Sequence, residues 1–534
     1  MSDARSGEDG TNVGQKGLAT GAVGLFGALV IGVSCVAPAY TLTAGLGPIV
    51  SVAGLQTPAI ILIGFLPMLL VALGYRELNQ ALPDNGTTFT WVTVTFGPWV
   101  GWMAGWGLVA STVLVLSNSA GVAVDFFYLL LAQASGHPHL AGLAADRTVN
   151  ILTCLAFMAG ATLISYRGME ATKLVQVMLV GLQVLAMCAF GVAAFVKAGS
   201  GQAFDQTPVA IAWFDPFAIP SGAALAAGLS LSIFIFWGWD VTLTMNEETR
   251  GSRSTPGLAA TGTVAVTMLL YLLASCATIT FAGIGTGALG LNNPETQRNV
   301  FQALAGPVFG PAAILVSVAV LCSSAAALQS TIVSPSRTLL AMSFYGAMPA
   351  ALGRTSARFR TPSVAIVVST LVSSAFYAAM RLYSEHVLWD TITALGIMIC
   401  FYYGMTAFSV VWFFRESWFD SVGNAFNRLI FPLTGGLALA VLFVKTLFDS
   451  LSPKFGSGSH LGSIGLVFVI GVGIFVTGLA VMAAMAVRRP AFFRAPLAGL
   501  DVPTRRGSGR AGAGAGTGTG TVRADTASDA VRRT

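Results

Sequence analysis

The strongest constraint on the fold is a series of long apolar runs. A helix of about 20 apolar residues crosses the hydrocarbon core of a bilayer, where lipid offers no partner for a free backbone N–H or C=O. Such runs are predicted near residues 21–46, 49–74, 99–131, 148–166, 171–196, 222–246, 258–284, 312–344, 363–381, 388–414, 429–449 and 463–487. With 55% hydrophobic and 9% charged residues, the chain is predicted to be an all-α membrane protein of about twelve transmembrane helices.

Two of these runs contain residues that interrupt a helix. The first reads from Gly24 to Tyr40 with Pro38 inside it, and the second reads from Gly228 to Asp240 with Gly238 between two tryptophans. Unwound backbone at membrane depth is tolerated only where it is buried in protein or lines a cavity. Paired breaks in the two halves of a chain therefore predict a substrate site at the midplane of a transporter.

The basic residues predict the orientation. If the N-terminus lies inside, the outer loops hold only six of the 28 Lys and Arg residues, namely Arg147, Lys197, Arg298, Arg381, Lys445 and Lys454. The positive-inside rule then places both termini in the cytoplasm, with the chain in the cytoplasmic membrane. The net charge of +6 follows from this bias and gives no reason to expect a nucleic acid partner.

Cysteine and histidine usage predicts neither a metal nor a cofactor. All six cysteines fall in predicted spans, where they are expected to pack as small apolar residues rather than form disulfides. The four histidines fall in outer loops, where solvation is the ordinary state. The first fifteen residues lack a cleavable signal pattern, so the first span is expected to remain as an anchor.

The chain divides by composition into a membrane part and a polar tail rich in Gly, Ala, Thr and Arg, which is predicted to be disordered. Spans one to five and six to ten are predicted to be inverted repeats, because each set begins with a broken helix and the tripeptides at 96–98 and 309–311 are both Phe-Gly-Pro. The predicted parts are a cytoplasmic segment 1–17, a ten-helix core 18–415 with repeats 18–197 and 222–415, helices 11 and 12 at 416–487, and a cytoplasmic tail 488–534.

Three groups of residues resemble signatures of one transporter superfamily. They are Tyr75-Arg76-Glu77-Leu78 with the stretch from Leu82 to Trp91 and Gly105-Trp106, then Asn246-Glu247-Glu248-Thr249 with Pro256, and finally Ser336-Arg337 with Gly346, Pro349 and Thr361-Pro362. In this order they resemble the amino acid-polyamine-organocation superfamily, and bacterial amino acid permeases in particular. The resemblance implies a leucine-transporter-type fold with a 5+5 inverted repeat and broken helices 1 and 6.

The resemblance also implies which residues meet the substrate. The first break is Val36-Ala37-Pro38-Ala39-Tyr40, where the family usually has a glycine-serine-glycine motif whose N–H groups receive a carboxylate; Pro38 has no N–H. In the second break, Phe234 matches an aromatic gate, with ordinary packing as the alternative. Around it lie Trp237, Gly238 and Asp240. Asp240 either faces the cavity or caps the following helix, and the tryptophans either contact substrate or face lipid and neighbouring helices.

The remaining candidates concern coupling and gating. Gln183 takes the position at which many proton-coupled relatives have a lysine, so it is expected to bridge helices, to admit Na⁺ with Ser323 or Ser324, or simply to pack. Tyr402 is a second gate candidate, with interior packing as the alternative. Glu247 and Glu248 are expected to form an inner gate with loop arginines, with proton acceptance as the alternative. Asp125 in the third span either attracts cationic substrates or is simply hydrated.

These observations favour a secondary active transporter that moves an amino acid or related amine by alternating access. An enzyme is not expected, because no His, Cys and acidic residues converge in the sequence, and no P-loop indicates ATP coupling. A polyamine or amine exchanger of the same fold and a transporter-like sensor are the alternatives. The sequence leaves open the substrate, the direction of transport, H⁺ or Na⁺ as the coupling ion, and the oligomeric state.

The orientation is tested by cysteine labelling. A cysteine introduced at Ser252 is expected to react with an impermeant maleimide only from the cytoplasmic side, and one at Ser459 only from outside. The reason is that loops rich in Lys and Arg are retained inside the cell. Labelling of intact cells is compared with labelling of inverted vesicles. The reverse pattern at both positions would overturn the predicted orientation.

Overall fold

The computed structural model describes residues 16–383, 387–453, 455 and 459–494. Two compact units divide the chain, Met1–Asp501 and Val502–Thr534, and the second lies outside the described residues. The helices are α1 Leu25–Val36, α2 Pro38–Ala53, α3 Thr57–Ala81, α4 Thr88–Phe96, α5 Pro98–Ser135, α6 Arg147–Tyr166, α7 Met169–Gly199, α8 Gly222–Ile235, α9 Val241–Thr244, α10 Thr255–Ala282, α11 Pro294–Arg298, α12 Val300–Phe309, α13 Ile314–Phe344, α14 Ser363–Tyr383, α15 Val387–Phe413, α16 Val422–Asn424, α17 Phe431–Asp449, α18 Leu466–Arg488 and α19 Pro490–Arg494. Two-residue strands β1 His460–Leu461 and β2 Ile464–Gly465 pair antiparallel.

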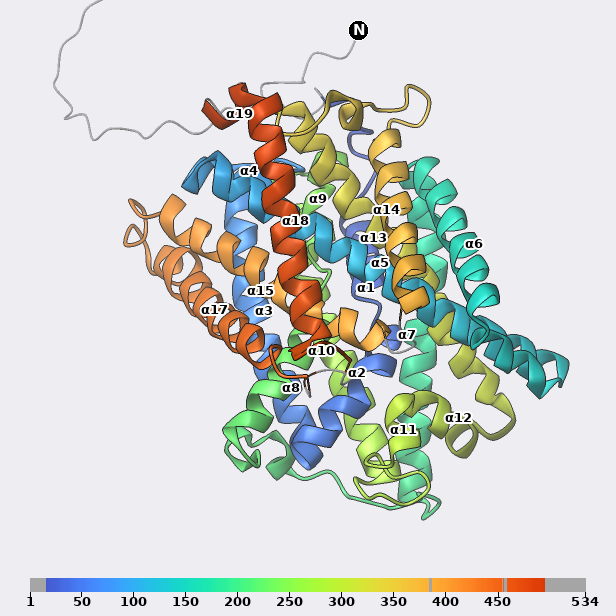
Figure 1. Cartoon of the computed structure of the whole chain (residues 1–534). Coiled ribbons are helices and arrows are strands. Elements are labelled where there is room, and N and C mark those ends of the chain that lie inside the picture. The colour runs from blue at the N-terminus through green and yellow to red at the C-terminus, as the bar shows by residue number, and fades with distance from the viewer. Residues whose placement is uncertain (1–15, 384–386, 454, 456–458, 495–534) are drawn as a thin grey trace, which may run out of the picture. The chain divides into compact units, whose positions relative to one another are not determined.

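Within the described residues, ten helical segments are long and apolar enough to cross a membrane. The first of them, Leu25–Ala81, joins α1, α2 and α3, and α8 is a further, shorter apolar helix. This agrees with the predicted spans, because the first segment holds two of them and α8 begins the sixth. Figure 1 shows α1 near the middle of the bundle, with α17 on one side and α6 on the other.

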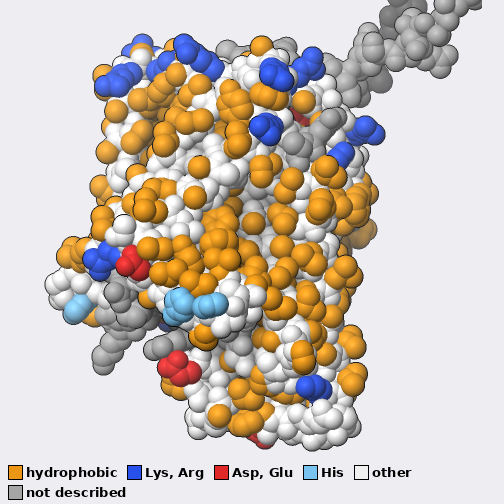
Figure 2. All heavy atoms as spheres, turned by 90° about the vertical axis from the view of Figure 1, so that its right-hand side faces the viewer, with side chains coloured by type: hydrophobic (Ala, Val, Ile, Leu, Met, Phe, Trp, Pro, Cys, Tyr) orange, Lys and Arg blue, Asp and Glu red, His pale blue; other side chains and the backbone are white. Residues whose placement is uncertain are grey.

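Large apolar side chains cover the flanks of the bundle. Leu152 of α6, Leu185 of α7 and Val441 of α17 are each more than 60% exposed. Figure 2 shows hydrophobic side chains over the visible flank, while Lys and Arg side chains gather at the end where α19 lies in Figure 1. Exposed apolar surface of this extent is the expected exterior of a multi-pass membrane protein.

The two Phe-Gly-Pro tripeptides adopt related turns. Gly97 has φ +91° and Gly310 has φ +58°, conformations in which a residue with a Cβ is strained. Each glycine directly follows a helix, α4 or α12, and a proline comes next in both cases. The matched turns agree with the repeated organisation predicted from the sequence.

The C-terminal end of the membrane part differs from the prediction. The tail was expected to begin at residue 488, but helix α19 continues the ordered chain to Arg494. The reason is aromatic packing: Phe492 stacks on Phe89 with ring centroids 5.7 Å apart, and Phe493 contacts Trp99 at 4.5 Å. The rest of the predicted tail, 495–534, lies outside the described residues.

Candidate substrate and gate site

The first helix break is centred on Ala37. Its φ of 53° places a non-glycine residue in the left-handed region between α1 and α2. Pro38 begins α2 and has no N–H, and the Tyr40 N–H donates to the Ser323 hydroxyl of α13 at 3.1 Å. The helix start therefore offers fewer free donors to a substrate carboxylate than a glycine-rich break would.

The second break directly contacts the first. Helix α8 ends at Ile235 and α9 begins at Val241, with Gly238 at φ +108° between them. A Cβ at position 238 would lie 3.1 Å from the carbonyl carbon and oxygen of Cys35, at the end of α1. Glycine is needed here both for the backbone conformation and for this close approach.

Two tyrosines of α15 hold the second break from the side. Tyr403 donates its hydroxyl to Asp240 Oδ1 at 2.8 Å, and Tyr402 donates to Asp240 Oδ2 at 3.4 Å. Trp237 Nε1 donates to the Tyr402 hydroxyl at 2.6 Å, and the Gly238 N–H donates to Tyr403 at 3.4 Å. These contacts tie a carboxylate, an indole and a backbone amide of the break to one helix.

The alternatives left open for this break are partly resolved by these contacts. Asp240 precedes α9 but makes no side-chain capping hydrogen bond, so the cap hypothesis is wrong. Trp237 and Trp239 are 4% and 0% exposed, so neither faces lipid. Phe234 lies in the last turn of α8 and is 4% exposed; its role as a gate stays a prediction.

The coupling candidates lie where α7 meets α13. Gln183 is fully buried, and among the described residues neither its Nε2 nor its Oε1 has a hydrogen-bond partner; the same holds for the Ser324 hydroxyl. Gln176, two turns earlier on α7, carries the bridging bonds: it accepts from the Ser34 hydroxyl of α1 and donates to the Ala326 carbonyl of α13. The bridge expected of Gln183 is therefore made by Gln176.

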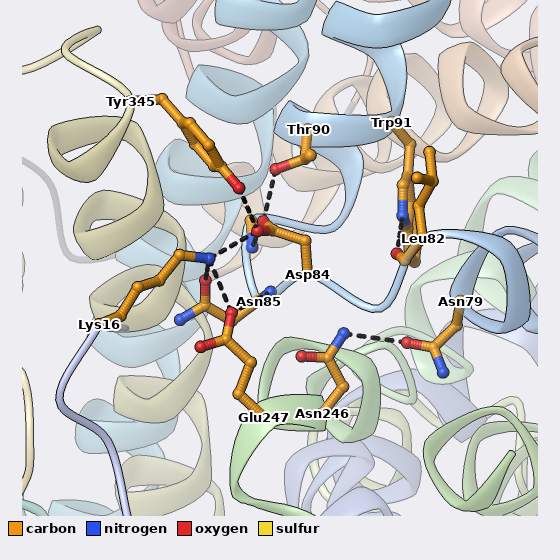
Figure 3. A network of polar contacts seen from close by, with 11 residues as sticks. Lys16, Asn79, Leu82, Asp84, Asn85, Thr90, Trp91, Asn246, Glu247 and Tyr345 are labelled. Atoms are coloured by element: carbon orange, nitrogen blue, oxygen red, sulfur yellow. Dashed lines mark hydrogen bonds and ion pairs between the residues drawn. The ribbon is translucent and has the colours of Figure 1, made fainter. Parts of the chain in front are cut away.

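At the α19 end of the bundle a buried lysine joins segments that are distant in sequence. Lys16 Nζ lies 2.6 Å from Asp84 Oδ2, 2.7 Å from Glu247 Oε1 and 2.7 Å from Asn85 Oδ1. Figure 3 shows Tyr345 and Thr90 pointing to the same Asp84 carboxylate, and each donates its hydroxyl at 2.6 Å. We call Lys16, Asp84, Asn85, Glu247 and Tyr345 the N-terminal latch.

A second ion pair lies beside the N-terminal latch. Arg337 of α13 donates to both oxygens of Glu248, at 2.9 and 3.1 Å. The arginine partner of Glu248 therefore comes from a helix and not from a loop, and the partner of Glu247 is Lys16. The gating role of the two acids stays a prediction. The Val23 N–H also donates to the Glu248 carbonyl, and the Arg250 N–H donates to the Val23 carbonyl. The N-terminal segment is thus bound to the chain that follows α9.

The charges of the N-terminal latch stabilise one another unequally. Burial alone would lower the pKa of Lys16, but Asp84 and Glu247 raise it above its usual value. Burial raises the pKa of Asp84, yet Lys16 and three donated hydrogen bonds bring it below its ordinary value. Burial also raises the pKa of Glu247, and Lys16 compensates only in part. Asp84 is therefore the principal counter-ion of Lys16.

Sequence reasoning missed most of the N-terminal latch. Asp84 and Asn85 stood in a quoted family signature without an assigned role, and Lys16 stood in a segment regarded only as polar. The available signal was a single lysine just before the first span together with acids in two loops between spans. No spacing rule joins residues 16 and 247, so the pairing required the fold.

Helix breaks that touch at mid-bundle and buried ion pairs at one end define a secondary transporter of the leucine-transporter fold. In a structural comparison the chain is similar to MhsT, solved in complex with L-phenylalanine, with a TM-score of 0.58 and 14% identity, covering 80% of this chain and 99% of that one. The family model for amino acid permeases matches residues 23–475. The chain belongs to the amino acid permease family.

Characterised relatives of the chain are distant. The branched-chain amino acid permease BcaP of Lactococcus lactis is 23% identical and covers 58% of this chain and 67% of its own length. The low-affinity putrescine importer PlaP of Escherichia coli is 22% identical, over 78% of this chain and 85% of its own length. The gamma-aminobutyric acid permease of Escherichia coli is 25% identical, over 59% of this chain and 64% of its own length.

The N-terminal latch predicts a cost for removing one of its charges. Lys16→Met leaves two buried carboxylates without a cation, which is expected to weaken the closed arrangement by about 3 to 5 kcal/mol. The rate at which N-ethylmaleimide labels Cys35, buried at the first break, reports opening in a protein whose other five cysteines are replaced by alanine. We expect labelling at least about a hundredfold faster. Lys445→Met, in an exposed pair with Asp449, is the control and should change little.

The two carboxylates of the N-terminal latch should respond differently to neutral isosteres. Both Asp84 oxygens accept hydrogen bonds. In Asp84→Asn the amide NH2 group must therefore face a hydrogen-bond donor, which is unfavourable. Glu247 Oε2 has no hydrogen-bond partner among the described residues, so Glu247→Gln should cost less than about 1 kcal/mol. Because the Asp84 pKa is lowered, its contribution is present above the ordinary pKa of 3.8 and is lost as pH falls through the lowered value. Equal labelling rates in both variants would contradict this account.

Proposed function

We propose that this protein moves an amino acid or related amine across the cytoplasmic membrane by alternating access, with the substrate bound at the two helix breaks. The observation that carries the proposal is the contact of Gly238 with Cys35, which brings both breaks to one place. The names of the relatives, which include a branched-chain amino acid, putrescine and gamma-aminobutyric acid, support this substrate class.

Within this proposal the break residues contact the substrate. Val36 to Tyr40 and Phe234 to Asp240 supply its walls. Phe234 and Tyr402 close over the substrate as an aromatic gate, and Asp240 is the acid nearest to the substrate. Because Pro38 and the Tyr40 amide offer no free donor, recognition depends more on the amine and the apolar part of the substrate than on a carboxylate.

The orientation proposed for the protein has the N-terminal latch at the cytoplasmic face. Support comes from the Lys and Arg side chains that gather at this end in Figure 2. In this orientation Glu247 and Glu248 belong to the inner gate, and the arrangement described here is closed toward the cytoplasm. Reversal of the gate requires that Lys16 leave Asp84 and that Arg337 leave Glu248.

Uptake into proteoliposomes tests the function. We expect the purified protein to accumulate one or more of leucine, putrescine and gamma-aminobutyric acid, and Phe234→Ala to weaken substrate binding by roughly 1 to 3 kcal/mol, because a buried aromatic contact is lost. Leu185→Ala, at a position 69% exposed on α7, is the matched control and should transport normally. Substrate binding without flux would make the protein a sensor, and flux only against internal substrate would make it an exchanger.

We propose that coupling does not depend on protonation of the side chain at position 183, where many proton-coupled relatives have a lysine. Gln183 carries no titratable proton and its amide has no partner among the described residues, so transport is expected to be exchange or to be driven through another group such as Asp240. We expect Gln183→Leu to retain the ion dependence of wild type in uptake driven by imposed H⁺ or Na⁺ gradients, and Asp240→Asn to alter the pH dependence. Proton coupling lost in Gln183→Leu and kept in Asp240→Asn would contradict the proposal.

A further inference from the structure

A cavity of about 530 Å³ opens at the end of the bundle opposite to the N-terminal latch. Its walls come from α2, α5, α6, the connection between α5 and α6, α12, α14 and α15. The residues that matter for its chemistry are Thr43, Asn118, Asp125, Phe126, Tyr377 and Arg381. In the proposed orientation this cavity faces the outside.

Polar groups of the cavity donate hydrogen bonds within the protein, whereas Asp125 makes no hydrogen bond to another described residue. The Tyr377 hydroxyl donates to Asn150, and the Thr43 hydroxyl donates to the Ala39 carbonyl. Asp125 is exposed to the cavity, and no hydrogen bond joins it to another of the described residues. The positive charge of Arg381, in the same lining, acts on Asp125, but its carboxylate oxygens remain without a hydrogen-bond donor among the described residues.

The chemistry around Asp125 favours an organic ammonium group. A single carboxylate is too few ligands for a divalent metal ion, which takes six or more oxygens in the calcium case. The rings of Phe126 and Tyr377 line the same cavity, and aromatic faces attract a weakly hydrated ammonium. Arg381 also lines the cavity but is already engaged within the protein, so Asp125 is the charged group offered to a ligand.

The floor of the cavity leads to the first helix break. Asn118 lines the cavity and accepts the hydroxyl of Tyr40, which is 1% exposed. Val122, also in the lining, packs against Ala37 and Tyr40. The Tyr40–Asn118 hydrogen bond therefore separates a ligand in the cavity from the break beneath it.

We propose that the cavity is an outer recognition site, at which Asp125 binds the ammonium group of the substrate before the Tyr40–Asn118 contact opens. The assignment as an entry site rests on the proposed transport function, and it adds a second position on the substrate path. It also assigns the substrate a positively charged amine, because an anion gains nothing at Asp125.

Thiol protection tests the site without flux. Ala141, which is half-buried in the cavity wall, is replaced by cysteine in a protein whose native cysteines are alanine, and methyl methanethiosulfonate is the neutral reagent. We expect butylamine to slow the reaction and butyrate and butanol not to. In Asp125→Asn the half-protecting butylamine concentration should rise at least about tenfold, because a charge-assisted hydrogen bond is lost.

Two matched variants complete the test. Asp205→Asn removes an exposed acid that does not line the cavity and should leave protection unchanged, while Asp125→Glu should retain it and shows that the fold tolerates substitution. Equal protection in wild type and Asp125→Asn, no protection in wild type, or protection by butanol would overturn the site. In uptake, Asp125→Asn should raise KM for the amine and leave kcat unchanged. Absence of flux with normal protection would refute the transport function and leave the ammonium site standing.

Discussion

The structure depends on the satisfaction of backbone groups where two membrane helices are interrupted. At this depth water is not available as a general partner, so each freed N–H or C=O must be bonded within the protein. Tyr271 of α10 donates to the Ile235 carbonyl at the end of α8, Tyr403 accepts from Gly238, and Ser323 accepts from Tyr40. Side chains of α10, α13 and α15 therefore complete the backbone of the breaks and fix where these helices pack.

The local parts of the fold were predictable because their causes are local. Apolar runs predict the spans, and the proline and glycine within two of them favour interruption, so the breaks at Pro38 and Gly238 were predictable. These residue types are not decisive alone, because Pro67 and Pro335 lie inside α3 and α13. The partners did not: Tyr403 lies 163 positions after Asp240, and Glu247 lies 231 positions after Lys16. Gln176 and Gln183 are the same residue type on one helix, and only the packing of α7 against α13 decides that Gln176 makes the bridge.

The two ends of the bundle hold their charged groups in different ways. At the N-terminal latch every charged group is buried and paired, so this end is closed by full charges in contact. At the opposite end Asp125 is exposed to a cavity, and the closure beneath it is a neutral hydrogen bond between Tyr40 and Asn118. The contact beneath the cavity thus involves no full charge, in contrast to the ion pairs at the other end.

Buried ion pairs suit a gate because their net contribution is small while the cost of mismatch is large. If the proposed gate opens, Lys16, Asp84 and Glu247 would regain hydration that offsets part of the lost attraction. Removal of a single partner has no such compensation. One lysine faces two acids in the N-terminal latch, so one carboxylate has no cation of its own. Because the pKa of Glu247 is raised, closure becomes easier when Glu247 takes up a proton. Asp84 retains its charge over the same pH range, so Lys16 and Asp84 would then form an ion pair with no net charge. Glu247 would therefore bind its proton more tightly in the closed state than in the open state.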